Sequence, residues 1–332
     1  MEEGDRMEPH NRQLWKVANA YSEEYLTHCT YICVVGSVAQ KEADEYSDLN
    51  LIAFTGKEST LGEYTVVYKE EYVHVQVKSI LEFPKGELIK YNPWHFHYLT
   101  EAMILKDNNG EFKKLQEWAR SYFQSTQGKT DVIEDVKRLV QSRLKFSEKQ
   151  QKEGASFVAT HALLGAWKEA ALLYQFISCQ HVSMVHLIPF LREKGWLQDT
   201  PVPLSMANHL TYEAILDTAL RLREHLREEG FSHLTKLTTL QDEVLTKKWE
   251  RMKESGQWVN AGWLAYHNVF LILMETSQDQ PFEVYFSHLP AKMKQRLNDL
   301  GFKELDYEQV SLLRHATEEL LTTAESTIEQ PS

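Results

Sequence analysis

Hydrophobic positions along the first third of the chain predict one helix and several strands. Apolar residues recur at helical spacing over residues 11–27, which is typical of an amphipathic helix. Strands are predicted where β-branched and aromatic residues concentrate, over residues 31–35, 49–54, 64–68 and 72–80. This part of the chain is therefore predicted to form a domain of mixed α and β structure.

The pattern changes beyond about residue 127, where long helix-periodic segments replace the β-branched runs. The predicted helices cover residues 131–152, 156–178, 182–194, 206–228, 235–254, 257–276, 283–299 and 307–326. The polar stretch STQGK, residues 125–129, is a boundary signal. We therefore predict an α+β protein, with a mixed β-sheet domain over residues 1–128 and an all-helical domain over residues 129–332.

Composition narrows the class of protein. The 332-residue chain has a formal net charge of −12, which argues against a dedicated surface for nucleic acid or an anionic membrane. Its three cysteines have no CxxC spacing and fit a reducing compartment better than a disulfide or zinc framework. The N-terminus is too polar for a signal peptide, and no apolar run approaches the roughly 18 residues of a membrane span. We expect a cytoplasmic protein that binds neither nucleic acid nor membranes.

The candidate chemistry lies in the stretch VVGSVAQKEADEYSDLNLIAF, residues 34–54. Gly36 would let the backbone approach a ligand closely, and Ser37 would add a hydroxyl donor beside the amides of the turn, which suits a triphosphate. Asp48 would open a strand in which positions 48 and 50 share one face, because side chains alternate along a strand. Two carboxylates at this spacing would hold magnesium, but the second position is Asn50.

This stretch resembles the signature of the nucleotidyltransferase superfamily, which includes DNA polymerase beta. Members carry an apolar residue, Gly and Ser, and then a strand of the form Asp-apolar-acid-apolar; the chain has VGS at residues 35–37 and DLNL at residues 48–51. The loop between them also resembles the bacterial branch that includes aminoglycoside and lincosamide nucleotidyltransferases. The segment at residues 104–119 resembles the strand, turn and helix that close the small domain of such proteins. The resemblance implies a nucleotidyltransferase-type sheet.

The resemblance also implies a substrate and a reaction. ATP or another nucleoside triphosphate is expected to contact Gly36, Ser37 and Ser47. The expected reaction is transfer of a nucleoside monophosphate, AMP when the donor is ATP, to a hydroxyl group of a small polar acceptor. Magnesium ions held by three carboxylates would neutralise the charge that develops on the phosphates.

Two of the three carboxylates that the resemblance requires are replaced by neutral residues. Asp48 remains, and Asn50 stands at the second position. The third position lies on the strand YVHVQVKSI and is assigned to Gln76, with His74 as the alternative. Because magnesium prefers hard, anionic oxygen ligands, we expect weak metal binding and a steep loss of two-metal catalysis.

The predicted helical domain contributes two further candidates. Lys168 and Glu169 interrupt the apolar helix HALLGAWKEAALL, residues 161–173. By the resemblance, Lys168 would bind the triphosphate and Glu169 would accept the proton of the acceptor hydroxyl. Adjacent charges on one helix usually mark its solvent-exposed side, which is the alternative interpretation of these two residues.

Three functional hypotheses follow. The first is a magnesium-dependent enzyme that transfers AMP to a small polar molecule. The second is a catalytically impaired protein that keeps the fold and binds a nucleotide or a protein partner, which the amides at Asn50 and Gln76 favour. The third, a toxin or antitoxin component, is disfavoured because a large helical domain is fused in the same chain. The sequence does not indicate the acceptor, the preferred base or the oligomeric state.

Overall fold

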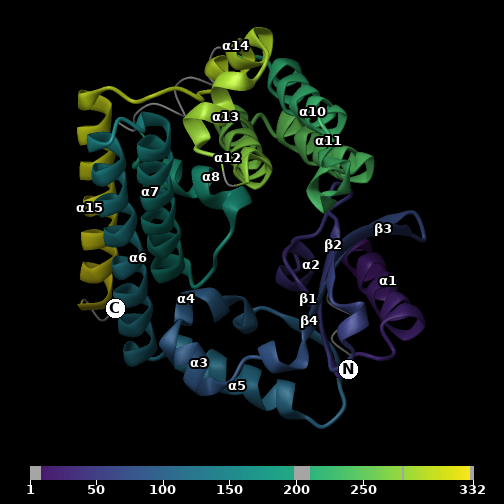
Figure 1. Cartoon of the computed structure of the whole chain (residues 1–332). Coiled ribbons are helices and arrows are strands. Elements are labelled where there is room, and N and C mark those ends of the chain that lie inside the picture. Colours follow the sequence, from purple (N-terminus) through teal and green to yellow (C-terminus); the bar gives the residue numbers. More distant parts are fainter. Residues whose placement is uncertain (1–8, 198–209, 279, 330–332) are drawn as a thin grey trace. The chain divides into compact units, whose positions relative to one another are not determined.

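The structure is a computed structural model that describes residues 9–197, 210–278 and 280–329 (Figure 1). It combines a β-sheet in the first third of the chain with helices in the remainder, so the predicted α+β class and the helical C-terminal region are confirmed. Within the described residues, no helix has both the length and the apolar character needed to cross a membrane.

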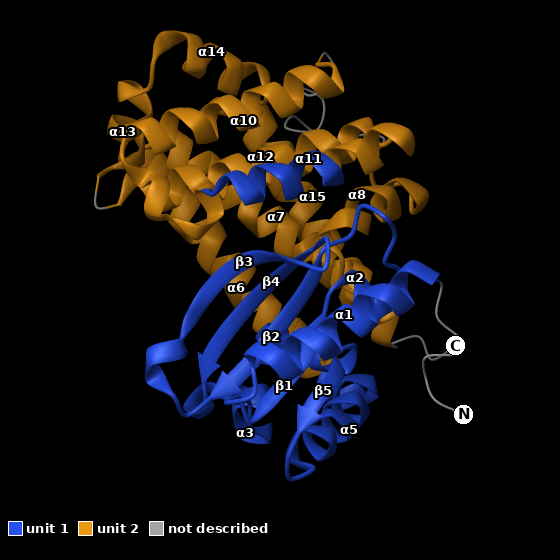
Figure 2. Cartoon of the chain, turned by 90° about the vertical axis from the view of Figure 1, so that its right-hand side faces the viewer, with its two compact units in different colours: residues 1–128, 238–248 blue, residues 129–237, 249–332 orange. Residues whose placement is uncertain are grey.

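The chain divides into two compact units (Figure 2). The first comprises residues 1–128 and 238–248, and the second comprises residues 129–237 and 249–332. The segment 238–248 is thus part of the first unit although more than a hundred residues separate it from residue 128 in the sequence. It includes most of a helix that ends in the second unit.

The first unit is built on a five-stranded mixed sheet with the strand order β3-β4-β2-β1-β5. The strands are β1 (Tyr31–Val35), β2 (Leu49–Thr55), β3 (Gly62–Tyr68), β4 (Glu71–Ser79) and β5 (Met103–Asp107). Strands β2 and β4 are parallel, whereas the other three neighbouring pairs are antiparallel. Because β1 and β2 are antiparallel, the end of β1 lies beside the start of β2, and Val35 pairs with Asn50.

Two long helices and three short ones accompany this sheet. They are α1 (Pro9–Tyr25), α2 (Ser37–Gln40), α3 (Gly86–Tyr91), α4 (Pro93–Phe96) and α5 (Glu111–Gln124), with 3-10 turns η2 (Glu58–Thr60), η3 (Ile80–Glu82) and η4 (His97–Thr100). Helix α1 covers one face, where its buried Leu14 and Val17 join a core that includes Leu51 and Val75. The alternation of apolar residues along β2 and β4 supplies that core, since every second side chain points to the same face.

The opposite face of the sheet is aromatic at one end and polar at the other. Phe54, near the end of β2, packs edge-on against Phe83 with ring centroids 5.2 Å apart, and Phe83 stacks on Tyr31 at 4.1 Å. At the start of β2 the same face carries Asn50, whose neighbour across the parallel pair is His74. The polar residues therefore cluster at the edge where β2 begins.

The chain beyond the β-sheet segment is helical, and its helices form the second unit apart from the start of α6 and residues 238–248. Counted from the boundary onward, the chain forms α6 (Thr126–Lys152), α7 (Ser156–Cys179), α8 (Met184–Glu193), α10 (Tyr212–Glu228), α11 (Thr239–Glu254), α12 (Trp258–Ser277), α13 (Phe282–His288), α14 (Ala291–Asp299) and α15 (Tyr307–Glu329), with 3-10 turns η6 (Phe231–His233) and η7 (Thr235–Leu237). Helices α7 and α12 are buried around much of their circumference, which agrees with their apolar sequences.

The predicted helix over residues 283–299 is wrong in one respect, because the structure has two helices there. Helix α13 ends at His288, and α14 begins after Pro290. Proline disfavours helical backbone at the residue before it, and Leu289 is accordingly extended. The predicted helix over residues 206–228 begins at Tyr212, and residues 206–209 lie outside the described residues.

The core between α1 and the sheet can be tested with a pair of leucines. Leu51 is 1% exposed, whereas Leu81 is 88% exposed. We expect Leu51→Ala to lower the free energy of unfolding by about 2–5 kcal/mol, because it leaves a cavity in a packed core. Leu81→Ala should change it by less than about 0.5 kcal/mol. Denaturant titration followed by circular dichroism measures both, and equal effects would contradict the assigned core.

Candidate functional site

The turn after β1 brings Gly36 against the start of β2. Gly36 has φ 73° and ψ −153°, a backbone conformation that side-chain-bearing residues rarely adopt. A Cβ atom at this position would lie 3.6 Å from Nδ2 of Asn50. Ser37 follows as the first residue of the short helix α2. The structure thus brings together the two parts of the motif, the Gly-Ser turn and the strand that carries Asn50.

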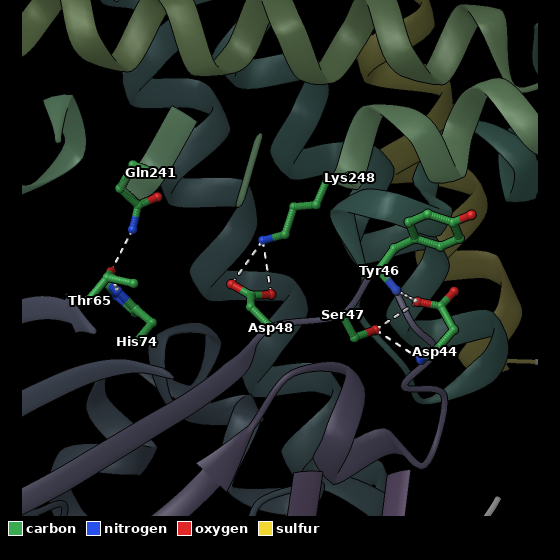
Figure 3. A network of polar contacts seen from close by, with 8 residues as sticks. All are labelled: Asp44, Tyr46, Ser47, Asp48, Thr65, His74, Gln241 and Lys248. Carbon is green, nitrogen blue, oxygen red and sulfur yellow. Dashed lines mark hydrogen bonds and ion pairs between the residues drawn. The ribbon is translucent and has the colours of Figure 1, made fainter. Parts of the chain in front are cut away.

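The loop before Asp48 is held by its own side chains. The Ser47 hydroxyl donates to Oδ1 of Asp44 and accepts from the Asp44 backbone N–H, both at 3.0 Å. The backbone N–H of Tyr46 also donates to Oδ1 of Asp44, at 3.1 Å. Ser47, expected to contact nucleotide, is 6% exposed, and its hydroxyl shapes the turn that leads into Asp48 (Figure 3).

Asp48 forms an ion pair with Lys248, which lies on α11. The Nζ atom of Lys248 is 3.0 Å from Oδ1 and 3.1 Å from Oδ2 of Asp48, and Figure 3 shows the ammonium facing both oxygens. The side chain of Asp48 is 14% exposed and that of Lys248 is 41% exposed. Both partners belong to the first unit, because residues 238–248 are part of it.

This ion pair controls the ionisation of Asp48. Burial raises the pKa of the carboxyl group, because a charge loses solvation inside the protein. The charge and hydrogen bond of Lys248, the Asp48 backbone N–H and nearby His74 act in the opposite direction, and the pKa lies below the ordinary value of 3.8. The ion pair therefore stabilises the folded chain above the ordinary pKa, and this contribution is lost as the pH falls through the lowered pKa.

The register of β4 places His74, not Gln76, beside Asn50. In the parallel pair, Asn50 is the partner of His74, and Gln76 is the partner of Ile52, two residues further along β2. His74, the alternative candidate for the third carboxylate position, is thus the β4 residue that the sheet brings to the start of β2. The charge of His74 also acts on Asp48, since it contributes to lowering the pKa of that carboxyl group.

Hydrogen bonds hold the His74 ring. Its Nδ1 atom lies 3.0 Å from Oγ1 of Thr65, and its Nε2 atom lies 3.1 Å from Oε1 of Glu63. The Thr65 hydroxyl accepts a hydrogen bond of 2.6 Å from Nε2 of Gln241 on α11. A Thr65 hydroxyl that accepts from Gln241 can donate to Nδ1, which leaves the proton of His74 on Nε2 facing Glu63.

Helix α11 contacts the first unit through side chains between Gln241 and Lys248. Besides Gln241 and Lys248, Glu243 accepts a hydrogen bond of 2.8 Å from the Tyr72 hydroxyl, and the Lys247 ammonium lies 4.9 Å from the centre of the Tyr72 ring. Sequence reasoning missed Lys248, which follows another lysine in a helix with the ordinary appearance of a solvent-exposed face. No local pattern distinguishes it from its neighbour.

The residues at the start of β2 do not fit a magnesium site held by protein carboxylates. The resemblance assigns acidic residues to three positions, and only the first of them, Asp48, carries an acid. Both carboxylate oxygens of Asp48 face the Lys248 ammonium. Among the described residues, His, Cys, Asp and Glu form no group of three or more that could hold a metal ion. Magnesium needs several oxygen ligands and sheds its water reluctantly, so one neutralised carboxylate is a poor donor set.

Lys168 and Glu169 lie in the second unit, whereas Gly36, Asn50 and Asp48 lie in the first. Oε1 of Glu169 is 3.2 Å from Nζ of Lys168 and 3.3 Å from Nη2 of Arg143 on α6. Glu169 is 7% exposed, so this carboxylate does not lie on a solvent-exposed face.

Gly165 and His267 are also affected by this charged group. A Cβ atom on Gly165 would lie 2.3 Å from Nη1 of Arg143, so the glycine leaves room for the guanidinium group. The pKa of His267 is lowered to about 4 by burial and by the charges of Lys168 and Arg143, with Glu169 opposing. The second unit thus holds a compact charged cluster of its own.

Comparison with known proteins adds little to this description. No protein-family model matches the chain, and no curated protein does. One solved structure, a nucleotidyltransferase-like protein from Exiguobacterium sibiricum, aligns with 96% of this chain and 78% of its own at 10% sequence identity, with a TM-score of 0.29. A similarity this low carries no argument about function, so the class of protein is inferred below from the residues themselves.

Replacement of Lys248 should change the ionisation of Asp48. In Lys248→Met the burial of the carboxyl group is no longer opposed by the ammonium, and we expect the pKa of Asp48 to rise above its ordinary value. Lys248→Arg, which keeps a cation, should leave the pKa below that value. Carbon-13 NMR titration of the aspartate carboxyl groups measures both variants. A pKa that stays low in Lys248→Met would mean that the ion pair does not control Asp48.

Proposed function

We propose that the first unit is a nucleotidyltransferase-like domain that binds a nucleoside triphosphate but has lost metal-dependent transfer. Of the hypotheses drawn from the sequence, we thus prefer the catalytically impaired protein to the active enzyme. The observation that carries it is the ion pair of Asp48 with Lys248, which engages the one retained acid of the motif.

Triphosphate binding is supported by the arrangement at the end of β1. Gly36 keeps the conformation that brings its backbone close to Asn50, and Ser37 follows directly. A glycine without a side chain here leaves the turn open to a ligand that approaches the backbone. ATP is the proposed ligand, on the strength of the motif in residues 34–54.

Loss of transfer is supported by the chemistry that remains beside Asp48. Two-metal transfer needs anionic ligands that hold cations against the phosphates. Asn50 is neutral, and the residue paired with it is His74, whose ring nitrogens already face Thr65 and Glu63.

Nucleotide binding can be tested with a matched pair of glycine variants. Gly36 has a positive φ and lies close to Asn50, whereas Gly56 has no atom within 4 Å of an added Cβ. A side chain at Gly36 costs about 1–3 kcal/mol of strain or shifts the turn, so Gly36→Ala should weaken ATP binding about tenfold or more. Gly56→Ala should bind ATP with the same affinity as the unchanged chain. Isothermal titration calorimetry measures all three, with circular dichroism to check that each is folded.

The same proteins serve to test for transfer. Pyrophosphate release from ATP with magnesium is measured in the presence of aminoglycoside and lincosamide acceptors, and no release above a protein-free blank is expected. Release that Asp48→Asn abolishes would overturn the loss of transfer and restore the enzyme hypothesis. Absence of ATP binding by the unchanged chain would instead contradict the nucleotide site.

A further inference from the structure

We propose that the ammonium group of Lys248 takes the place of a metal ion at Asp48, so that the site binds a triphosphate without a divalent cation. The inference rests on the proposed function and adds to it the cation requirement of the same site. It concerns one residue of α11 that comes from a part of the chain 200 residues away from Asp48.

The geometry at Asp48 is that of a bound cation. The Lys248 ammonium contacts both carboxylate oxygens, at 3.0 and 3.1 Å, and a second cation approaching them would meet its positive charge. An ammonium group has three N–H donors, so contacts with two oxygens leave a third available. Since the Lys248 side chain is 41% exposed, that donor can reach a ligand oxygen that arrives from solvent.

Charge explains why a metal ion is no longer required. Three carboxylates would repel a triphosphate until cations neutralised them, which is the part that magnesium plays in such sites. Here the charges of Asp48 and Lys248 cancel, and Asn50 is neutral. The Glu63 carboxylate is paired with His74 at 3.1 Å, and the Asp44 carboxylate is hydrogen-bonded within the loop that precedes Asp48. The electrostatic barrier to a metal-free triphosphate is therefore lower than at a site with three unpaired carboxylates.

Contacts along α11 fix the direction of Lys248. Gln241 is hydrogen-bonded to Thr65, and the Lys247 ammonium lies over the ring of Tyr72. Successive residues of a helix point about 100° apart, so Lys247 and Lys248 leave the same helix in different directions. Lys247 is thus a matched control, because it has the same charge and lies on the same helix but packs over the Tyr72 ring, whereas Lys248 pairs with Asp48.

The first experiment measures ATP binding by calorimetry in excess EDTA and in magnesium. The unchanged chain should bind within about twofold of the same affinity in both, and Lys248→Met should bind about tenfold or more weakly in EDTA, because it loses the cation that faces the phosphates. Lys247→Met should stay within about twofold of the unchanged chain, and Lys248→Arg should recover most of the loss.

Either of two results would overturn the inference. Magnesium that strengthens ATP binding to the unchanged chain more than about tenfold would show that a metal ion is still required. ATP binding to Lys248→Met that equals or exceeds that of the unchanged chain would show that Lys248 obstructs the site.

A second experiment needs no nucleotide and therefore separates this inference from the proposed function. Asn50→Asp restores a carboxylate at the start of β2, two residues after Asp48, and Mn2+ alone is the probe, measured by calorimetry and by electron paramagnetic resonance. The double variant Asn50→Asp, Lys248→Met should bind Mn2+ about tenfold or more tightly than Asn50→Asp alone.

The two experiments fail in distinguishable ways. If the unchanged chain binds no ATP but the double variant gains Mn2+, the proposed function is wrong while the position of Lys248 at the metal site stands. If both Asn50→Asp proteins bind Mn2+ equally, Lys248 does not occupy that position and the inference fails whatever the nucleotide result.

Discussion

The ion pair between Asp48 and Lys248 is the interaction on which the interpretation of this protein depends. A carboxylate that is 14% exposed would be costly to keep ionised without a partner, because burial raises its pKa. The ammonium group reverses that effect and keeps the pKa below its ordinary value. The same contact engages the oxygens that a metal ion would need. One contact therefore both keeps the buried carboxyl group ionised and occupies its two oxygens.

The sheet determines which residues surround that pair. Antiparallel pairing of β1 with β2 places the turn at Gly36 beside Asn50, and parallel pairing of β2 with β4 places His74 next to Asn50 on the other side. The polar edge is thus assembled from three strands that also supply the core beneath α1. Because side chains alternate along each strand, one set of residues builds the core while the other set, on the opposite face, includes Asn50 and His74.

Helix α11 gives the first unit a component that is remote in sequence. Its first half contacts β3 and β4 through Gln241 and Glu243, and its Lys248 reaches Asp48. These contacts are polar and partly exposed, so each contributes modestly to stability, whereas together they orient the helix. A helix held in this way is suited to presenting one side chain at a defined point. The chain thereby gains at Asp48 an ammonium group from a residue that is 200 positions away in the sequence.

Periodicity alone predicted the class of fold and the positions of most elements, because alternation along strands and helical spacing are local properties of the sequence. The helix break before Pro290 was equally local and could have been predicted from that residue. The motif with Gly36, Asp48 and Asn50 identified where a site would lie. Tertiary structure alone decided that His74 pairs with Asn50 and that Lys248 meets Asp48, since register and long-range packing depend on segments up to 200 residues apart, which no local pattern encodes.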